Sequence, residues 1–125
     1  MTEGLLTARD EDRLRGVHPD LARLVRRARR TTTFSVIEGL RSLDRQRDLV
    51  ARGASRTMLS RHLTGHAVDL APIPLDWTNR ESFRALADVM AAAAAAEGVH
   101  LKWGGAFRGF FDGPHFELPE DQYPA

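Results

Sequence analysis

Apolar residues recur three and four positions apart in several segments of the chain, which is the spacing of one helix face. In residues 18–30, HPDLARLVRRARR, a proline suits the first turn, and the apolar positions that share the inner face are Leu21, Leu24, Val25 and Ala28. Residues 42–53, SLDRQRDLVARG, predict a second helix that is capped by Ser42 or Asp44 and closed by Gly53.

A third helix and four short strands complete the pattern. Residues 78–98, TNRESFRALADVMAAAAAAEG, predict a long helix that starts at a threonine or asparagine cap and ends at a glycine. Strands are predicted within residues 32–40, where β-branched residues gather, and at 67–71, where two prolines follow. Residues 99–105 and 115–118 predict two more strands. The expected fold class is α+β: helices pack on one side of a small, mostly antiparallel sheet.

Length and composition predict one ordinary globular domain over residues 1–125. The chain has no cysteine, which excludes disulfides, a thiolate nucleophile and a zinc finger of the cysteine type. Any metal must therefore be held by histidine, aspartate or glutamate. Neither a signal peptide nor an apolar run long enough to span a bilayer is visible, so we expect the protein to be made and kept in the cytoplasm.

Basic residues are concentrated in the first half of the chain. Residues 1–61 carry 14 basic and 8 acidic side chains, whereas residues 62–125 carry 4 basic and 9 acidic ones. The run RLVRRARR is either a nucleic-acid arm or the solvated face of a helix. No aromatic residue interleaves with its arginines, which favours the solvated face and a protein without a nucleic-acid partner.

The five histidines are the first candidates for chemistry. His18 precedes a proline at a helix start and is expected to cap that helix, and His100 is expected to point away from the core. His62 and His66 have the i, i+4 spacing of helical His-Glu-x-x-His zinc peptidases. However, leucine follows His62 where that motif has glutamate, and Gly65 inside a helix costs about 1 kcal/mol relative to alanine.

The alternative is that Gly65 forms a turn and that HAVDLA continues as a strand. Alternation along HAVDLA and HFEL then buries the large apolar side chains and puts Asp69, His115 and Glu117 on the other face. Neighbouring strands would bring Asp69 and His115 together, and the upstream turn could add His62. Two imidazoles, one carboxylate and a water make an open tetrahedral zinc site of the catalytic kind. Alternation alone leaves this open, because such residues occur on strand faces for many reasons.

Three blocks of the sequence resemble motifs of the D-alanyl-D-alanine dipeptidase and carboxypeptidase superfamily. SRHLTGHAVDL resembles its first zinc motif, Ser-x-His-x-x-Gly-x-Ala-x-Asp. WGGAFRGFFDGPHFEL resembles the second, in which an acidic residue stands three positions before a histidine that opens His-Phe-Glu, and EGLRSLDRQ resembles the upstream Gly-x-Arg-Ser…Gln segment. The blocks occur in the same order. Within the superfamily, the chain most resembles the short phage endolysins that are L-alanyl-D-glutamate peptidases, because its length and the segment GVHPDL near the start fit that branch.

The resemblance implies roles for individual residues. It implies that zinc, one ion per chain, is bound by His62, Asp69 and His115, that Asp112 is the general base and that Arg41 stabilises the oxyanion. It also implies that Ser60 contacts substrate or braces His62. Apart from the resemblance, we expect Trp103 to contact substrate, although Trp103 and residues 107–111 could equally belong to the core. Phe107 stands where relatives often have tryptophan, and no role is carried over to His66.

Some of these residues have simpler interpretations. Arg41 could have no role beyond an ion pair with Asp44 or Asp48 on the helix that follows it. Asp112 could be a turn residue before a glycine. Glu117 could replace Asp69 as a ligand, but it is more suited to hold the second nitrogen of a ligand histidine.

The resemblance implies a zinc metallopeptidase that hydrolyses the L-alanyl–D-glutamate bond of peptidoglycan stem peptides, as a phage or prophage endolysin. Such an enzyme is a monomer that stays in the host cytoplasm until a holin releases it to the cell wall, and it has no membrane or nucleic-acid partner. The alternatives are a D,D-carboxypeptidase or dipeptidase on the same scaffold and a non-catalytic zinc-containing wall-binding module.

Overall fold

A computed structural model describes residues 4–55, 57–107 and 109–124 of the chain. The helices are α1 (Ala8–Arg13), α2 (Pro19–Arg29), α3 (Leu43–Ala51) and α4 (Arg80–Glu97), with two 3-10 turns, η1 (Arg61–Thr64) and η2 (Gly104–Ala106). The strands are β1 (Phe34–Glu38), β2 (Ala67–Pro72), β3 (Lys102–Trp103) and β4 (His115–Glu117). The strands form one antiparallel sheet in the order β1-β2-β4-β3.

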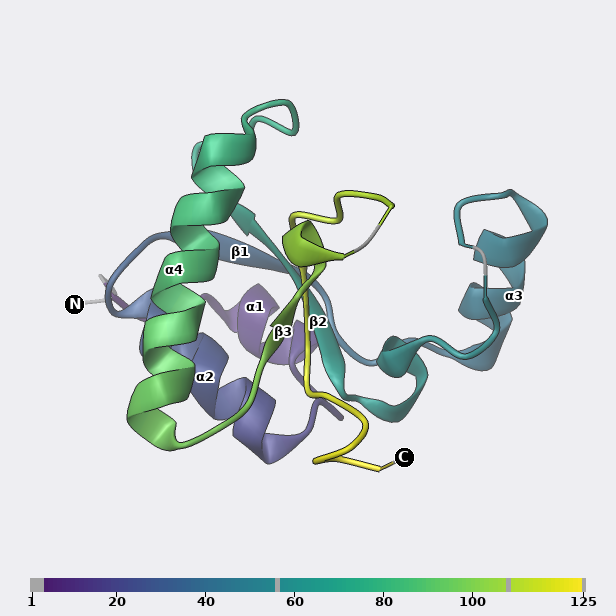
Figure 1. Cartoon of the computed structure of the whole chain (residues 1–125), viewed down its shortest axis with the longest axis horizontal. Coiled ribbons are helices and arrows are strands. Elements are labelled where there is room, and N and C mark those ends of the chain that lie inside the picture. The colour runs from purple at the N-terminus through teal and green to yellow at the C-terminus, as the bar shows by residue number, and fades with distance from the viewer. Residues whose placement is uncertain (1–3, 56, 108, 125) are drawn as a thin grey trace.

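The core lies between the sheet and the layer formed by α2 and α4 (Figure 1). Phe34, Val36, Leu70 and Phe116 of the sheet are buried there against Leu24 of α2 and Met90 of α4. The predicted α+β class, with helices on one side of a small antiparallel sheet, is confirmed. None of the described helices is both long and apolar enough to cross a bilayer.

Helix α2 follows the sequence prediction closely. The side chain of His18 caps it by accepting a hydrogen bond from the backbone N–H of Asp20 at 3.0 Å. The predicted apolar face is buried, while three arginines on the other face form ion pairs with acidic side chains of α1, α2 and α4. Arg23 and Arg27, for example, both bond to Glu97. The basic run is therefore a solvated helix face whose charges are partly neutralised within the molecule.

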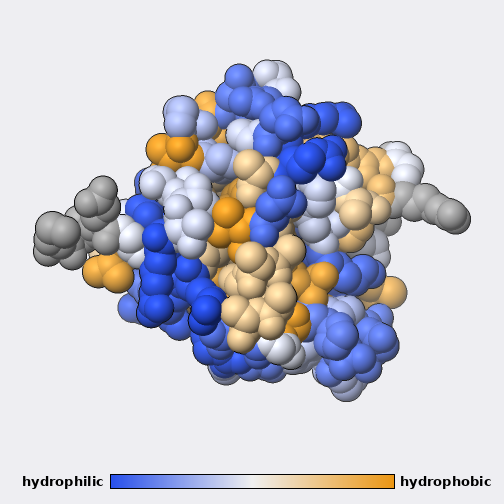
Figure 2. Space-filling view, turned by 60° about the vertical axis from the view of Figure 1, so that its left-hand side comes forward, coloured by the Kyte–Doolittle hydropathy of each residue, from blue (hydrophilic) through white to orange (hydrophobic). Residues whose placement is uncertain are grey.

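Helix α4 begins at the asparagine cap and ends at Gly98, whose φ of +69° suits a glycine. Its inner face fills the core, and its outer face leaves small side chains such as Ala91 and Ala95 exposed. Figure 2 brings the α4 side forward and shows a pale apolar strip between hydrophilic borders. The alanine run is thus an ordinary part of a packed helix.

Two segments depart from the expected pattern. Helix α1 was not predicted, because it is short and polar; a capping box between Thr7 and Asp10 forms its first turn. The strand expected over residues 99–105 is limited to Lys102–Trp103. The chain turns at Gly104, where a Cβ atom would lie 2.2 Å from the carbonyl oxygen of Asp112.

Helix α3 stands apart from the other helices (Figure 1). It borders the side of the sheet that α2 and α4 do not cover. Ser42 rather than Asp44 caps it, by accepting a hydrogen bond from the N–H of Arg45. Its one buried side chain is Gln46, which is polar. Apolar packing therefore contributes little to the position of α3, and hydrogen bonds must hold it.

Candidate metal centre and active site

The sheet brings together polar residues that lie far apart in the sequence. Asp69 on β2 stands directly opposite His115 on β4, as the alternation of the two strands predicted. On the other side of β2, a β-bulge after Val36 shifts the register so that Glu38 stands opposite Asp69. One face of the sheet therefore carries Glu38, Asp69 and His115 in a row across three strands.

His62 reaches this row from the turn η1 that precedes β2. Ser60 caps the turn by accepting a hydrogen bond from the N–H of His62 at 3.2 Å. Gly65 ends it with φ +77°, and a Cβ atom there would lie 2.2 Å from the carbonyl oxygen of Gly16. The segment from His62 to His66 is therefore a 3-10 turn followed by a strand, and the i, i+4 helical interpretation is wrong.

Each of the two imidazoles is oriented by a hydrogen bond on the nitrogen that faces away from Asp69. Nδ1 of His62 lies 2.8 Å from the carbonyl oxygen of Gly39, and Nε2 of His115 lies 2.7 Å from Oε1 of Glu117. Carbonyl and carboxylate oxygens only accept hydrogen bonds, so these two nitrogens carry the protons. In a neutral imidazole the other nitrogen then has a free lone pair.

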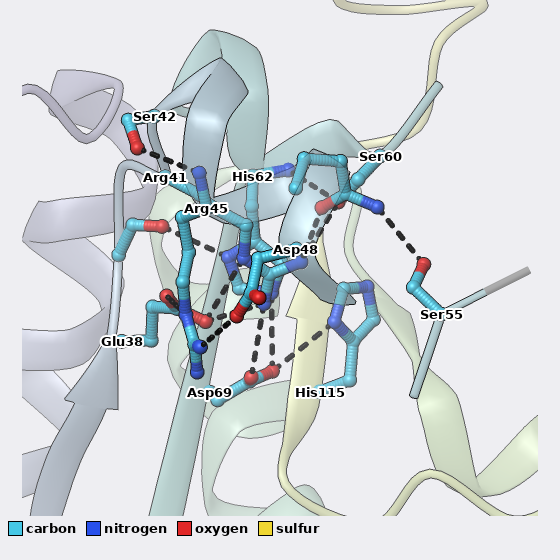
Figure 3. A network of polar contacts seen from close by, with 12 residues as sticks. Glu38, Arg41, Ser42, Arg45, Asp48, Ser55, Ser60, His62, Asp69 and His115 are labelled. Carbon is cyan, nitrogen blue, oxygen red and sulfur yellow. Dashed lines mark hydrogen bonds and ion pairs between the residues drawn. The ribbon is translucent and has the colours of Figure 1, made fainter. Parts of the chain in front are cut away.

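Both of those other nitrogens point at the same oxygen atom (Figure 3). Oδ1 of Asp69 lies 3.3 Å from Nε2 of His62 and 3.2 Å from Nδ1 of His115. Nε2 of His62 is buried and has no hydrogen-bond partner among the described residues. Three electron-rich atoms that converge in this way need a cation between them, either protons on the rings or a metal ion.

The donor set fits a metal ion. One ligand atom from each of His62, Asp69 and His115 lies within 4.8 Å of the other two. Two imidazoles and one carboxylate match the three protein ligands of catalytic zinc sites. The hydrogen bonds that the two imidazoles donate to Gly39 and Glu117 correspond to the outer contacts that orient such ligands.

Without a metal ion, protons lie between the imidazole nitrogens and the carboxylate of Asp69. Burial alone would lower the pKa of His115, but its hydrogen bonds to Asp69 and Glu117 outweigh burial and raise this pKa to about 9. Burial alone would raise the pKa of Asp69, but the hydrogen bond with His115 and the nearby imidazole of His62 hold it well below its ordinary value. A metal ion would have to displace the proton of His115.

A cavity of about 870 Å³ opens over this row of residues. Arg41 lies in its wall, and its guanidinium donates to Glu38, to Oε1 of Gln46 at 2.8 Å and to Oγ of Ser60 at 3.5 Å. Its Nη2 also lies 4.0 Å from Oδ2 of Asp69. Arg41 is therefore fixed beside the candidate metal centre by Glu38 and Gln46, and not by Asp44 or Asp48, which were the partners in the simpler interpretation.

Asp112 lines the same cavity on the loop that leads into β4. Its backbone N–H donates to Gly104 at 3.0 Å, and its carbonyl accepts from the N–H of His115 at 3.2 Å. This turn places the side chain next to the candidate metal centre. Burial is the largest cause that raises the pKa of Asp112, and the charge of Asp69 raises it further, against the opposing charges of His115 and His62.

Trp103 is not among the described residues that line the cavity, although its ring packs against that of Phe111, which does line it. It stands opposite Phe116, a core residue, and its indole N–H donates to the carbonyl of Gly113 at 2.7 Å. This placement favours the core alternative over the predicted substrate contact: Trp103 braces the 112–115 loop. Phe107, Phe110 and Phe111 provide the aromatic part of the cavity wall.

The remaining histidines lie outside the centre. His66 bonds to Thr64 and packs near the rings of His18 and Tyr123, and His100 is exposed, as expected. Sequence reasoning missed Glu38, because the bulge in β1 breaks the alternation on which the prediction depended.

The comparisons with known proteins agree with this geometry. The family model described as phage L-alanyl-D-glutamate peptidase matches residues 4–119. The chain belongs to that family. The family assignment made from the three sequence blocks is thereby confirmed.

Individual relatives support the assignment. The chain is 30% identical to the L-alanyl-D-glutamate peptidase of Escherichia phage T5, in an alignment that covers 86% of this chain and 93% of that protein. It is 34% identical to the L-alanyl-D-glutamate peptidase of Listeria phage A118 over 66% of this chain and 29% of the longer phage protein. The crystal structure of Serratia marcescens L-Ala D-Glu endopeptidase ChiX superimposes with a TM-score of 0.91 at 47% identity, and the match covers 98% of this chain and 96% of that one.

Proposed function

We propose that this protein is a zinc peptidase that hydrolyses the L-alanyl–D-glutamate bond of peptidoglycan stem peptides. The observation that carries the proposal is the convergence of His62, Asp69 and His115 at the base of a cavity, in a member of the phage L-alanyl-D-glutamate peptidase family. Two imidazoles and one carboxylate leave a fourth position open for a reactant.

In this proposal His62, Asp69 and His115 hold one zinc ion, which when bound supplies a Lewis acid and a nucleophile at neutral pH. Asp112 takes the proton of the attacking water and later gives it to the leaving amine. Its raised pKa supports this role, because a more basic carboxylate is a better proton acceptor. The outer contacts of Gly39 and Glu117 keep the two imidazoles in the tautomers that the ion requires.

Arg41 would stabilise the negative charge that develops on the scissile carbonyl oxygen. A guanidinium is permanently charged, and here it is fixed by Glu38 and Gln46 before substrate arrives, so little reorganisation is needed during the reaction. Loss of such a donor typically lowers the rate by about 10²–10³. Ser60 would brace His62 through its backbone N–H, which supports the second of its two predicted roles.

Mass spectrometry of purified peptidoglycan tests the proposal. Treatment with the zinc-loaded protein should release fragments that begin with D-glutamate, and a chelator should abolish their formation. Release of D-alanine would instead support the D,D-carboxypeptidase or dipeptidase alternative. Binding of one zinc ion per chain without any cleavage would support a non-catalytic wall-binding module. Cleavage at the parental rate by zinc-treated His62→Ala protein would contradict the ligand assignment.

The biological setting is part of the same proposal. Residues 1–125 would act as a single peptidase domain and a monomer, in a phage or prophage endolysin that a holin releases from the host cytoplasm. The family match, which is to peptidases of phages, supports this setting. Sedimentation of the purified protein and lysis of host cells with and without a co-expressed holin would test it.

A further inference from the structure

Lys102 is the only lysine of the chain, which otherwise uses arginine for its basic side chains. It is exposed, it lies on the edge strand β3, and it lines the cavity. Lys102 stands opposite Glu117, and Glu117 and His115 are on the same face of β4. Diagonal neighbours across an antiparallel pair are about 7–8 Å apart, so a lysine side chain at this position can reach the space next to His115.

The other described cations of the cavity wall already have partners. Arg41 bonds to Glu38 and Gln46. Arg61 donates to the backbone carbonyls of residues 118 and 123 at 2.8 and 2.7 Å. Arg45 lies 3.6 Å from Asp48 and 4.0 Å from Glu38.

Lys102 differs from these arginines in having no ion pair within 4.0 Å among the residues that the structure describes. Its Nζ lies 6.0 Å from the centre of the Phe107 ring, and that ring lies 5.6 Å from the ring of His115. The ammonium group is thus held over the aromatic wall close to the candidate metal centre. Among the cations of this wall that the structure describes, Lys102 is the one that is available to a ligand.

The proposed substrate carries a matching charge. A glutamate residue within a peptide uses one of its two carboxyl groups to continue the chain, and the other one stays free and is anionic at neutral pH. In an L-alanyl–D-glutamate bond the glutamate supplies the scissile nitrogen, so its free carboxylate lies only a few bonds from the reacting carbonyl. A cationic hydrogen-bond donor for this carboxylate must therefore lie close to the candidate metal centre.

We propose that the ammonium group of Lys102 binds the free carboxylate of the D-glutamate residue and makes the enzyme prefer this acid over the corresponding amide. The inference rests on the proposed function and names the residue that determines specificity within it. A lysine suits this place because its flexible stem and three donors can follow a carboxylate that moves during the reaction.

The test uses two synthetic stem peptides that differ only in whether the free carboxyl group of D-glutamate is an acid or a primary amide. Rates are measured with the zinc-loaded wild-type protein and with Lys102→Met, Lys102→Arg and Arg84→Met variants. Arg84 is the control for a general loss of positive charge, since it is exposed and its guanidinium lies 5.6 Å from the ring centre of Trp103.

We expect Lys102→Met to lower kcat/KM for the acid peptide about tenfold, mostly through KM, and to change kcat/KM for the amide peptide by less than about twofold. Lys102→Arg should retain the preference for the acid, and Arg84→Met should behave like the wild type. An equal loss on both peptides, or no loss on either, would overturn the proposal.

A second measurement does not depend on turnover. In the zinc-loaded Asp112→Asn variant, acetylation of Lys102 by an activated ester is followed by mass spectrometry of the fragment that contains this single lysine. The acid peptide should slow acetylation more than the amide peptide does. If the wild type cleaves neither peptide but the acid peptide protects Lys102, the proposed hydrolysis fails and the carboxylate contact stands. Equal acetylation with both peptides overturns the contact, whatever the activity.

Discussion

The carboxylate of Glu117 lies 2.7 Å from Nε2 of His115, on the side of the imidazole that faces away from Asp69. This hydrogen bond fixes the ring and leaves Nδ1 to face the candidate metal centre. Burial alone would raise the pKa of Glu117, but the hydrogen bond from His115 and the charges of His115 and Lys102 lower it. Glu117 therefore stays ionised and holds the His115 imidazole in place from the side that faces away from the candidate metal centre.

The Glu117→Ala variant should bind zinc about 10–100 times more weakly than the wild type, because outer partners of ligand histidines typically contribute this much to metal affinity. Competition with a chromophoric chelator measures the change. Glu120→Ala is the matched control, since Glu120 also lines the cavity and is exposed. An equal loss in both variants would mean that only the negative charge of the cavity matters.

Much of this centre was predictable from strand alternation. The pattern in HAVDLA and HFEL placed Asp69 and His115 on one face, and the register of β2 and β4 brings them directly opposite each other. The glycine in TGHAV indicated a turn, and Gly65 indeed forms one, so that His62 joins the same group. Local rules placed these side chains on one face because each residue sits in regular backbone or in a tight turn, but only the resemblance to the family singled them out as metal ligands.

The supporting residues could not be predicted in the same way. Glu38 faces the centre because of a bulge whose position is set by pairing with β2, which lies about 30 residues further along the chain. Gln46 lies on a helix with few apolar positions, so periodicity did not show that this side chain is buried. Trp103 and Lys102 are adjacent on a strand and face opposite sides, and only the pairing with β4 determines which of them reaches the cavity.

Replacement of Asp112 by asparagine should separate catalysis from metal binding. We expect Asp112→Asn to lower peptidoglycan cleavage about 10²–10⁴-fold, the usual contribution of a general base, and to bind zinc like the wild type. Its melting temperature should not fall, because burial already disfavours the charged carboxylate. Cleavage kinetics, zinc titration and thermal unfolding measure the three quantities. The exposed Asp121→Asn variant is the control, and full activity of Asp112→Asn would exclude this residue as the base.

The metal-free protein should lose stability as the pH rises from 6.5 to about 9. The pKa of His115 is raised from its ordinary 6.5 to about 9 in the folded protein, because its bonds to Asp69 and Glu117 outweigh burial. The folded state thus binds this proton more tightly than the unfolded state, and its stabilising effect is complete below pH 6.5 and disappears through pH 9. Asp69, whose pKa is lowered, stabilises the fold above pH 3.8 and ceases to do so as the pH falls further.

Thermal unfolding in chelator at several pH values measures this effect. A metal ion competes with the same proton, so the difference in Tm between zinc-loaded and chelated protein should grow over this pH window. The His100→Asn variant, which changes an exposed histidine, should show the same fall as the wild type. A chelated protein whose Tm stays level or rises from pH 6.5 to 9 would contradict the protonated pairing of His115 with Asp69.

Gln46 should couple the position of α3 to the activity of Arg41. Its amide oxygen accepts from Arg41 at 2.8 Å, and its nitrogen donates to Oγ of Ser55 at 2.9 Å and to the carbonyl of Thr57 at 2.6 Å. Gln46→Met keeps the volume but leaves these partly buried polar groups without their partner, which should destabilise the fold by about 1–3 kcal/mol. Urea unfolding measures the loss, and Arg47→Gln on the exposed face of α3 should change stability by less than about 0.5 kcal/mol.

The effect of Gln46 on catalysis should depend on Arg41. At a temperature where the Gln46→Met and Arg41→Ala variants are folded, Gln46→Met should lower kcat several-fold. The reason is that the guanidinium of Arg41 keeps its bonds to Glu38 but loses the bond to the Gln46 amide that helps to fix it. In an Arg41→Ala background the same substitution should have little further effect on kcat, since there is no guanidinium left to orient. If the two losses multiply instead, Gln46 acts on the cavity wall independently of Arg41.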